Sequence, residues 1–318
     1  MRLRMPVFAS LICCLAYAQT GNVAGPSAGY VFDSSANALR QIRGIPGAAL
    51  MSDAVDLGMT AAGAVVAPRG DSALAVAADG SIHLFQLANG AATEIAVQGL
   101  SGAPSRMVFS PSGSAAVLYR GNAVQILRGL PGSPDLGQPL PVPAVSGGTA
   151  QAAAATGTSR MPALAVSDDG TCVLIGRETS VALVQYPGGN RLLTDAHGAA
   201  QVAFAPGGHD AAVVTGGTLS IFQDVTGAST RQDFPGAFAP GGLAFSADGG
   251  KVVMAGLRTA TVWDRATSDA KRVECDCRID GITPMGSWFR LNEAGSGPVW
   301  ILDAAAGKVY FVPARPGA

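Results

Sequence analysis

The sequence predicts an all-β protein built from repeated four-stranded units. Charged residues make up only 14% of the chain, and 42 of its 318 residues are glycine. Average proteins contain about 25% charged residues and about 7% glycine, so this chain lacks the Glu, Lys and Arg that cover surface helices and is rich in turn formers. A second observation, one turn pattern that recurs along the chain, indicates how the strands are organised.

The clearest copy of this pattern is LAFSADGGKVVMAG at residues 243–256. An apolar run leads into a polar turn at residues 246–250, and a second apolar run follows. A hairpin explains the turn better than a phosphate loop, because phosphate loops precede a helix N-terminus and no helix is predicted here. Similar turns join apolar runs at residues 66–76, 108–118, 165–175, 203–214 and, in a weaker form, 290–301. Six copies predict a repeat architecture.

Each copy continues into a third apolar run and, in several cases, a more polar fourth run. The third runs lie at residues 82–85, 124–127, 181–184, 219–222, 260–263 and 308–311. The fourth run is charged in the copy that ends at residues 270–274. Apolar central strands and a charged outer strand are typical of a four-stranded antiparallel sheet whose centre is buried and whose edge lies in water.

The turns of the 244–249 type, together with Val262-Trp263-Asp264, resemble the β-propeller superfamily, and within it the YVTN-type and WD-type repeats. The resemblance covers nearly the whole chain after the N-terminal segment. It departs from true WD repeats because the Trp-Asp dipeptide occurs once and the regular Gly-His pair is missing. The resemblance therefore implies the propeller fold, and it supports a WD-type interaction role much less.

The number of blades follows from what the repeats leave over at the termini. Strand-like segments remain at residues 30–33, 39–43, 298–302 and 308–312. These strands are enough to complete the sixth, C-terminal blade but too few to form a seventh blade as well. This favours six blades, with the N-terminal segment completing the C-terminal blade so that strands from both termini close the ring, and it leaves seven open. Residues 131–160, rich in Pro, Gly and Ala, are predicted to be an inserted loop.

The N-terminus, MRLRMPVFASLICCLAYAQT, has the pattern of a secretory signal peptide at residues 1–18. A short basic head precedes an apolar stretch that is too short to span a membrane, and cleavage is expected after Ala18. A lipoprotein signal at Cys13 or Cys14 is the alternative, although Ile12 stands where such signals have a small residue. We therefore predict a secreted or periplasmic protein from which the leader is removed. Its single propeller domain covers residues 19–318, has no membrane span and is monomeric.

The cysteines left after the predicted leader are Cys172, Cys275 and Cys277. Cys172 borders an apolar run and is predicted to be a buried, inert thiol. If Cys275 and Cys277 lie in a strand, their side chains share one face, and a direct bond between them needs unusual backbone geometry. Separate thiols, or a bond to another partner, are the expectation, and a soft-metal or redox role is the alternative.

Other reactive residues are interpreted as structural. Asp168-Asp169 and His209-Asp210 recur in the turn between the first and second runs, where aspartate stabilises its own turn. His83 and His197 lie at other, scattered points of the repeats, which does not predict a metal site unless the fold brings all three histidines to the central channel. We therefore predict no catalytic, cofactor-binding or metal-binding residues and no cofactor.

Basic and acidic residues nearly balance, at 21 and 22, and neither forms a long run. A nucleic-acid partner is therefore not expected, because phosphate recognition requires a basic surface. The predicted function is a non-catalytic, exported binding or scaffold module that holds a protein, peptide or glycan with its loops or channel mouth. The alternative is an exported propeller enzyme, similar to lactonases or dehydrogenases, with its site in the central channel.

Overall fold

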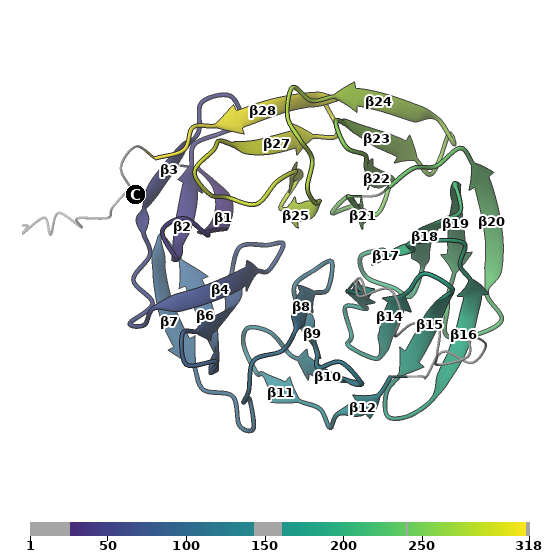
Figure 1. The fold of residues 1–318 in the computed structure, drawn as a ribbon, viewed down its shortest axis with the longest axis horizontal. Helices are drawn as coiled ribbons and strands as arrows, with labels where there is room; N and C mark the ends of the chain where they lie inside the picture. The colour runs from purple at the N-terminus through teal and green to yellow at the C-terminus, as the bar shows by residue number, and fades with distance from the viewer. Residues whose placement is uncertain (1–25, 143–160, 240, 316–318) are drawn as a thin grey trace, which may run out of the picture.

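The computed structural model describes residues 26–142, 161–239 and 241–315. The described chain consists of strands and turns that form seven sheets arranged around a central axis (Figure 1). Each sheet is one blade of a β-propeller, and each is built from one continuous stretch of sequence. The predicted signal peptide and residues 143–160 of the predicted insertion lie outside the described residues.

The first four blades lie within residues 27–195. The first contains β1 (Ser27–Asp33), β2 (Ala38–Arg43) and β3 (Leu50–Ala54). The second contains β4 (Ala61–Val66), β5 (Ser72–Ala77), β6 (Ile82–Ala88) and β7 (Ala91–Ile95). The third contains β8 (Arg106–Phe109), β9 (Ala115–Tyr119), β10 (Ala123–Arg128), β11 (Asp135–Leu136) and β12 (Leu140–Pro141). The fourth contains β13 (Ala163–Val166), β14 (Cys172–Gly176), β15 (Ser180–Gln185) and β16 (Asn190–Asp195).

The last three blades are regular four-stranded antiparallel sheets. The fifth contains β17 (Gln201–Phe204), β18 (Ala211–Thr215), β19 (Thr218–Gln223) and β20 (Thr230–Pro235). The sixth contains β21 (Gly242–Phe245), β22 (Lys251–Ala255), β23 (Thr259–Asp264) and β24 (Ala270–Glu274). The seventh contains β25 (Thr283–Met285), β26 (Trp288–Arg290), β27 (Val299–Asp303) and β28 (Lys308–Val312).

The propeller has seven blades, so the prediction that favoured six is wrong. The difference lies in the last repeat, where the turn pattern predicts that residues 290–311 hold the first three strands of a blade. They hold the second, third and fourth strands, since β25 precedes them as the inner strand. β25 has only three residues and contains Pro284, which hides its strand signal. The seventh blade is therefore complete without the N-terminal segment, which forms a blade of its own.

The first blade differs from the others in strand number and direction. Its strand β1 starts beside the turn of the second blade, where Gly70 lies against Tyr30, and ends where Ser34 meets Ala294 of the seventh blade. It therefore runs in the direction of the second strand of the other blades. The Gly286 amide donates to the Pro68 carbonyl at 2.7 Å. The turn after the inner strand of the seventh blade therefore contacts the corresponding turn of the second blade, although the first blade stands between these two blades in the ring.

Contacts between the first and seventh blades close the ring without exchange of strands. Both the Ser34 amide and its hydroxyl donate to the Ala294 carbonyl, at 3.1 and 2.9 Å. Arg315, which follows β28, forms an ion pair with Asp53 of β3. The apolar side chains in this junction include Val31, Ile42 and Met285. The prediction that strands from the two termini close the ring by sharing one blade is wrong, because each blade keeps its own strands.

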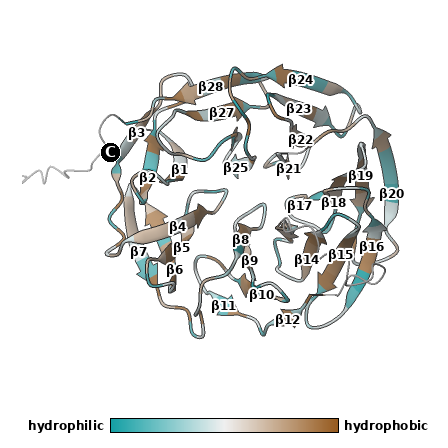
Figure 2. Cartoon of the chain, viewed as in Figure 1, coloured by the Kyte–Doolittle hydropathy of each residue, from teal (hydrophilic) through white to brown (hydrophobic). Residues whose placement is uncertain are grey.

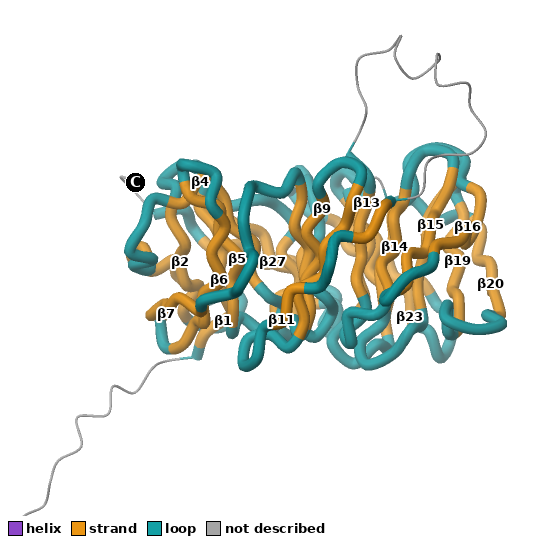
Figure 3. The backbone as a smooth tube through the Cα atoms, turned by 90° about the horizontal axis from the view of Figure 1, so that it is seen from below, coloured by secondary structure: helices purple, strands orange, loops and turns teal. Residues whose placement is uncertain are grey.

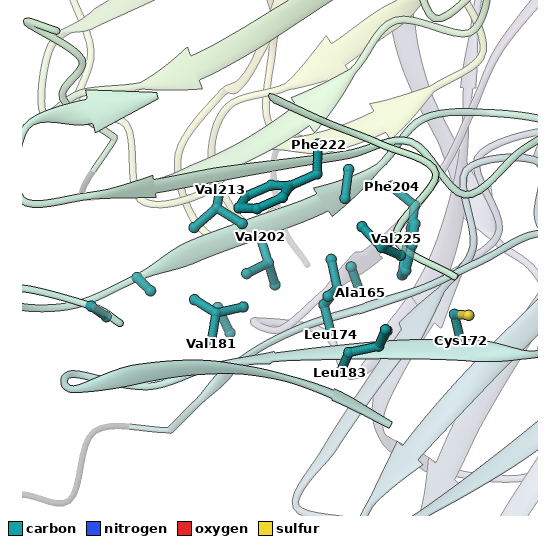
Figure 4. Close-up of a cluster of buried hydrophobic side chains, with 14 residues drawn as sticks. Ala165, Cys172, Leu174, Val181, Leu183, Val202, Phe204, Val213, Phe222 and Val225 are labelled. Carbon is teal, nitrogen blue, oxygen red and sulfur yellow. The ribbon is translucent and has the colours of Figure 1, made fainter. Parts of the chain in front are cut away.

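Seven clusters of buried apolar side chains pack the described part of the chain, one at each junction between neighbouring blades. The cluster between the fourth and fifth blades joins Leu174 and Leu183 to Phe204 and Phe222 (Figure 4). Polar residues gather on the outer strands β16, β20 and β24, as predicted for the fourth run (Figure 2). Both faces of each blade are thus buried against its neighbours, and the outer strands lie at the solvent-exposed rim.

The first part of the predicted insertion is not a loop. β11 and β12 both pair with β10, so residues 135–141 form the outer edge of the third blade in two short pieces. Prolines at positions 131, 134, 139, 141 and 143 predict a loop here, but those at 134 and 141 lie beside or within the broken edge strand. Proline is tolerated at a sheet edge because its missing N–H is not needed there.

We predict that Val252→Asp abolishes folding, because Val252 is 0% exposed between two blades and a charge there has no partner. The free energy of unfolding should fall by about 4 kcal/mol or more. As the control, Arg272→Ala on the exposed outer strand β24 should change it by about 0.5 kcal/mol at most. Urea titration followed by circular dichroism measures both, and a native unfolding curve for Val252→Asp would contradict the blade assignment.

We also predict that Gly29→Ala weakens ring closure. Gly29 has φ +135°, and a Cβ there would lie 2.5 Å from Cγ of Met285. Gly58 also has a positive φ, +66°, but its Cβ would meet open space, so Gly58→Ala isolates the backbone strain at about 1 kcal/mol. Gly29→Ala should cost at least about 1 kcal/mol more because of crowding, and equal losses of thermal stability in the two variants would contradict the role of Met285.

Candidate functional site

The two faces of the ring are distinguished by the strand connections. On the turn face lie the turns that follow the inner strands, at residues 67–70, 110–113, 167–170, 205–208 and 246–249. On the opposite side, here called the entry face, the inner strands of the second to seventh blades begin. The ring is seen edge-on in Figure 3, with the strands running between the two faces. Arg106, Ala163, Gln201, Gly242 and Thr283 are the first residues of their inner strands and belong to the entry face.

A cavity of about 460 Å³ occupies the centre of the ring. The inner strands β4, β8, β13, β17, β21 and β25 line it, together with Tyr30 and Phe32 of β1. The side chains of β1 reach the cavity because no inner strand covers them within the described residues of the first blade. Most of the wall is apolar, with Val108, Leu164 and Val202 as examples. This size and lining are within the range of binding pockets for small molecules or short chain segments.

Three arginines line the cavity, and two of them are neutralised by carboxylates. Nε of Arg69 lies 2.7 Å from Oδ2 of Asp71. Nη2 of Arg290 lies 2.9 Å from both carboxylate oxygens of Glu293, and burial lowers the pKa of Arg290 while Glu293 opposes that shift. Both pairs place a negative charge beside the arginine, so neither guanidinium is a strong attractor for an anion.

Arg106 is the exception, because the described residues give it no acidic partner. Its Nη1 donates to the carbonyl of Pro162 at 3.0 Å, which is a neutral acceptor. The side chain is exposed to the solvent inside the channel, yet the surrounding wall desolvates the guanidinium and lowers the pKa of Arg106. Arginine still carries its charge at neutral pH, so this position supplies an uncompensated positive charge at the entry-face mouth.

Exposed apolar side chains lie on loops of the same face. Met161 precedes β13 and is 52% exposed, and Phe238 precedes β21 and is 64% exposed. Leu257, in the turn between β22 and β23, is 60% exposed. All three residues belong to the entry face: Met161 and Phe238 come shortly before inner strands that begin there, and Leu257 lies between a strand that ends there and one that begins there. Large exposed apolar side chains that share one face are typical of surfaces that contact another molecule.

On the turn face, Asp168 holds three neighbouring blades together. Its Oδ1 accepts from the Ser112 amide and its Oδ2 from the Gly207 amide, both at 2.7 Å. Ser112, Asp168 and Gly207 belong to the turns of the third, fourth and fifth blades. The turns of the third and fifth blades also contribute residues to the cavity wall. Asp168 was predicted to stabilise its own turn, but it binds the turns of the two neighbouring blades. The sequence of one repeat cannot reveal such contacts between blades.

Asp169 stabilises its own turn, as predicted. Its Oδ1 accepts from the Ser167 hydroxyl at 2.6 Å and from the Thr171 amide at 3.0 Å, and its Oδ2 lies 3.0 Å from Nε2 of His209. Burial acts to raise the pKa of Asp169, but the hydrogen bonds from Ser167 and Thr171 and the charge of His209 outweigh it and lower the pKa to about 2. The carboxylate thus links the fourth blade to the fifth.

The three histidines occupy separate places and none belongs to the cavity wall. His83 of β6 lies 2.8 Å from the Ser81 hydroxyl and 2.7 Å from Oε1 of Glu94. The Ser81 hydroxyl also lies 2.6 Å from Oδ1 of Asp79, whose turn it completes. This chain of contacts lies on the second blade, where it ties β6 to β7, and His197 lies in the connection between β16 and β17.

Cys275 and Cys277 are joined to each other by a disulfide, contrary to the expectation of separate thiols. The expectation assumed a strand, but the strand β24 ends at Glu274 and the chain bends at Asp276. The bend brings the two Cα atoms to 5.0 Å, within the ordinary range for a disulfide. Both cysteines are buried against the seventh blade. Cys172 is a buried thiol as predicted, and burial raises its pKa.

Within residues 26–142, 161–239 and 241–315, no three His, Cys, Asp or Glu side chains are grouped so that they could hold a metal ion. A search of the same residues for a helix with the length and apolar character of a membrane span found none.

Solved structures with the same fold show little sequence similarity to this chain. A functionally unknown protein from Desulfotomaculum acetoxidans superposes with a TM-score of 0.59 at 13% identity, over 90% of this chain and 100% of the other. The apo structure of AztD from Citrobacter koseri gives 0.53 at 12% identity, over 91% and 82%. No protein-family model and no curated protein matches the sequence. Identities this low establish the fold and leave function to the site.

The sequence reasoning missed Arg106, although a signal for it existed. At the equivalent position, the first residue of the inner strand, the fourth to sixth blades carry Ala163, Gln201 and Gly242. A charged residue at this position departs from the pattern, and the repeat alignment alone could have singled it out.

We predict that Asp169→Asn destabilises the protein in a pH-dependent way. The pKa of Asp169 is lowered from 3.8 to about 2, so its contribution is fully present above pH 4 to 5 and is lost as the pH falls towards 2. The side chain is 46% exposed, so solvent screening limits the effect to about 1 kcal/mol. Urea unfolding at pH 6, 4, 3 and 2 should show the two proteins converging, and a constant difference would contradict this assignment.

Proposed function

We propose that this protein is an exported, non-catalytic binding protein that takes up part of a peptide or protein partner at the entry-face mouth of its channel. The observation that carries the proposal is the cavity of about 460 Å³, whose wall is formed by the inner strands of six blades. Close packing at every junction fixes these strands, so the cavity is present before a partner arrives. A preformed site binds without the cost of ordering its own residues.

The surroundings of the cavity support a protein or peptide partner. Met161, Phe238 and Leu257 offer exposed apolar contacts on the entry face, where Arg106, Ala163 and Gln201 line one end of the cavity. Apolar or aromatic anchors dominate the affinity of many protein interfaces. Glycan sites commonly stack sugars on exposed aromatic rings. Trp263, Trp288 and Trp300 pack in the apolar clusters between blades. Phe238 is exposed, but it shares the entry face with the aliphatic side chains of Met161 and Leu257, a mixture that suits a peptide better than a glycan.

Export is part of the proposal and rests on the sequence pattern at residues 1–18. The buried disulfide between Cys275 and Cys277 is compatible with an oxidising compartment, where such bonds persist. The partner would then be another exported chain, or one that the protein meets at the cell surface.

The proposal is tested with a synthetic pool of N-acetylated hexapeptides of mixed sequence, half with free C-termini and half amidated. Peptides retained by the purified protein are identified by mass spectrometry, and their Kd values are measured by calorimetry. Gln201, half-buried at the start of β17, lines the cavity, so Gln201→Trp should obstruct it and raise Kd by about tenfold or more.

Lys271→Ala on the exposed strand β24 is the matched control and should leave Kd unchanged. Both variants should keep the wild-type melting temperature, which shows that any loss of binding is local. The proposal fails if the protein retains no peptide, or if the retained peptides bind wild type and Gln201→Trp equally well.

A further inference from the structure

We infer that Arg106 binds the C-terminal carboxylate of the partner, so that the protein recognises free chain ends. This inference rests on the proposed peptide-binding function and adds the chemical group that the site selects. It begins with the contrast among the three arginines of the cavity. Arg69 and Arg290 are each held by a carboxylate of this chain, whereas among the described residues the hydrogen bond of Arg106 is to the neutral carbonyl of Pro162.

The position of Arg106 makes its charge effective. It is the first residue of β8, at the entry-face mouth, and the wall beyond it is mainly apolar. A charge at the mouth of a cavity with low-dielectric walls is poorly screened and attracts an ion of opposite sign. Within the part of the chain that the structure describes, Nη1 is engaged by Pro162 while Nε and Nη2 have no acceptor. These two neighbouring N–H donors match the two oxygens of a carboxylate.

The apolar wall favours a chain end over an acidic side chain within a peptide. A residue in mid-chain brings amide groups on both sides, and these polar groups need hydrogen-bond partners when they leave water. A C-terminal residue carries its carboxylate and one flanking amide only. Its carboxylate can stay at the mouth beside Arg106 while its apolar side chain enters the cavity past Val108 and Leu164.

The test compares each retained hexapeptide as the free acid and as the C-terminal amide, a pair that differs only in the proposed recognition group. The wild-type protein should bind the acid about tenfold or more tightly than the amide, the effect expected for one charge-assisted contact. Arg106→Gln should remove this preference, and Arg106→Lys should retain part of it, because lysine keeps the charge without the paired donors. Arg272→Gln on β24 is the control and should retain the full preference.

The outcomes separate this inference from the function on which it rests. If acid and amide bind equally, or if Arg69→Gln rather than Arg106→Gln removes the preference, the role of Arg106 is overturned while peptide binding stands. If neither form binds, the proposed function itself fails. Decanoate serves as an alkyl carboxylate without a peptide group, and binding of decanoate through Arg106 in place of every peptide acid would overturn the peptide as the source of the carboxylate.

Discussion

Burial of both faces of every blade is the constraint on which this structure depends. A single blade exposes two apolar faces, and each face leaves water only when another blade covers it. The seven apolar clusters, one at each junction, show how this requirement is met around the ring. The requirement is satisfied for the first and last blades only if they meet, which the contacts of Ser34 with Ala294 and the packing of Met285 achieve.

Closure of the ring also creates the candidate site. The inner strands converge on the axis because the blades are wedged side by side, and the space they cannot fill is the central cavity. The first blade contributes differently, since β1 presents Tyr30 and Phe32 to the cavity without an inner strand in front of it. Residues far apart in the sequence thus meet around one cavity, as Arg106 of the third blade and Arg290 of the seventh blade do.

Several features were predictable from the sequence because they are local. The turn of residues 246–250, the outer charged strand that ends at Glu274 and the capping role of Asp169 each depend on a few neighbouring residues. The errors came where the local signal was weak or was altered by the surroundings. β25 is too short to be recognised, β11 and β12 are interrupted by proline, and the chain bends between Cys275 and Cys277.

The sequence by itself determined the all-β class, the four-stranded unit and the propeller architecture, because alternation of apolar runs and turns repeats along the chain and needs no knowledge of distant contacts. The tertiary structure decided the number of blades, since this depends on whether the N-terminal strands join the C-terminal blade or form a blade of their own. It also decided which charges are paired, because Asp168 reaches two other blades and Arg106 meets no carboxylate among the described residues. Pairing is a property of distance in space, and the sequence gives only separation along the chain.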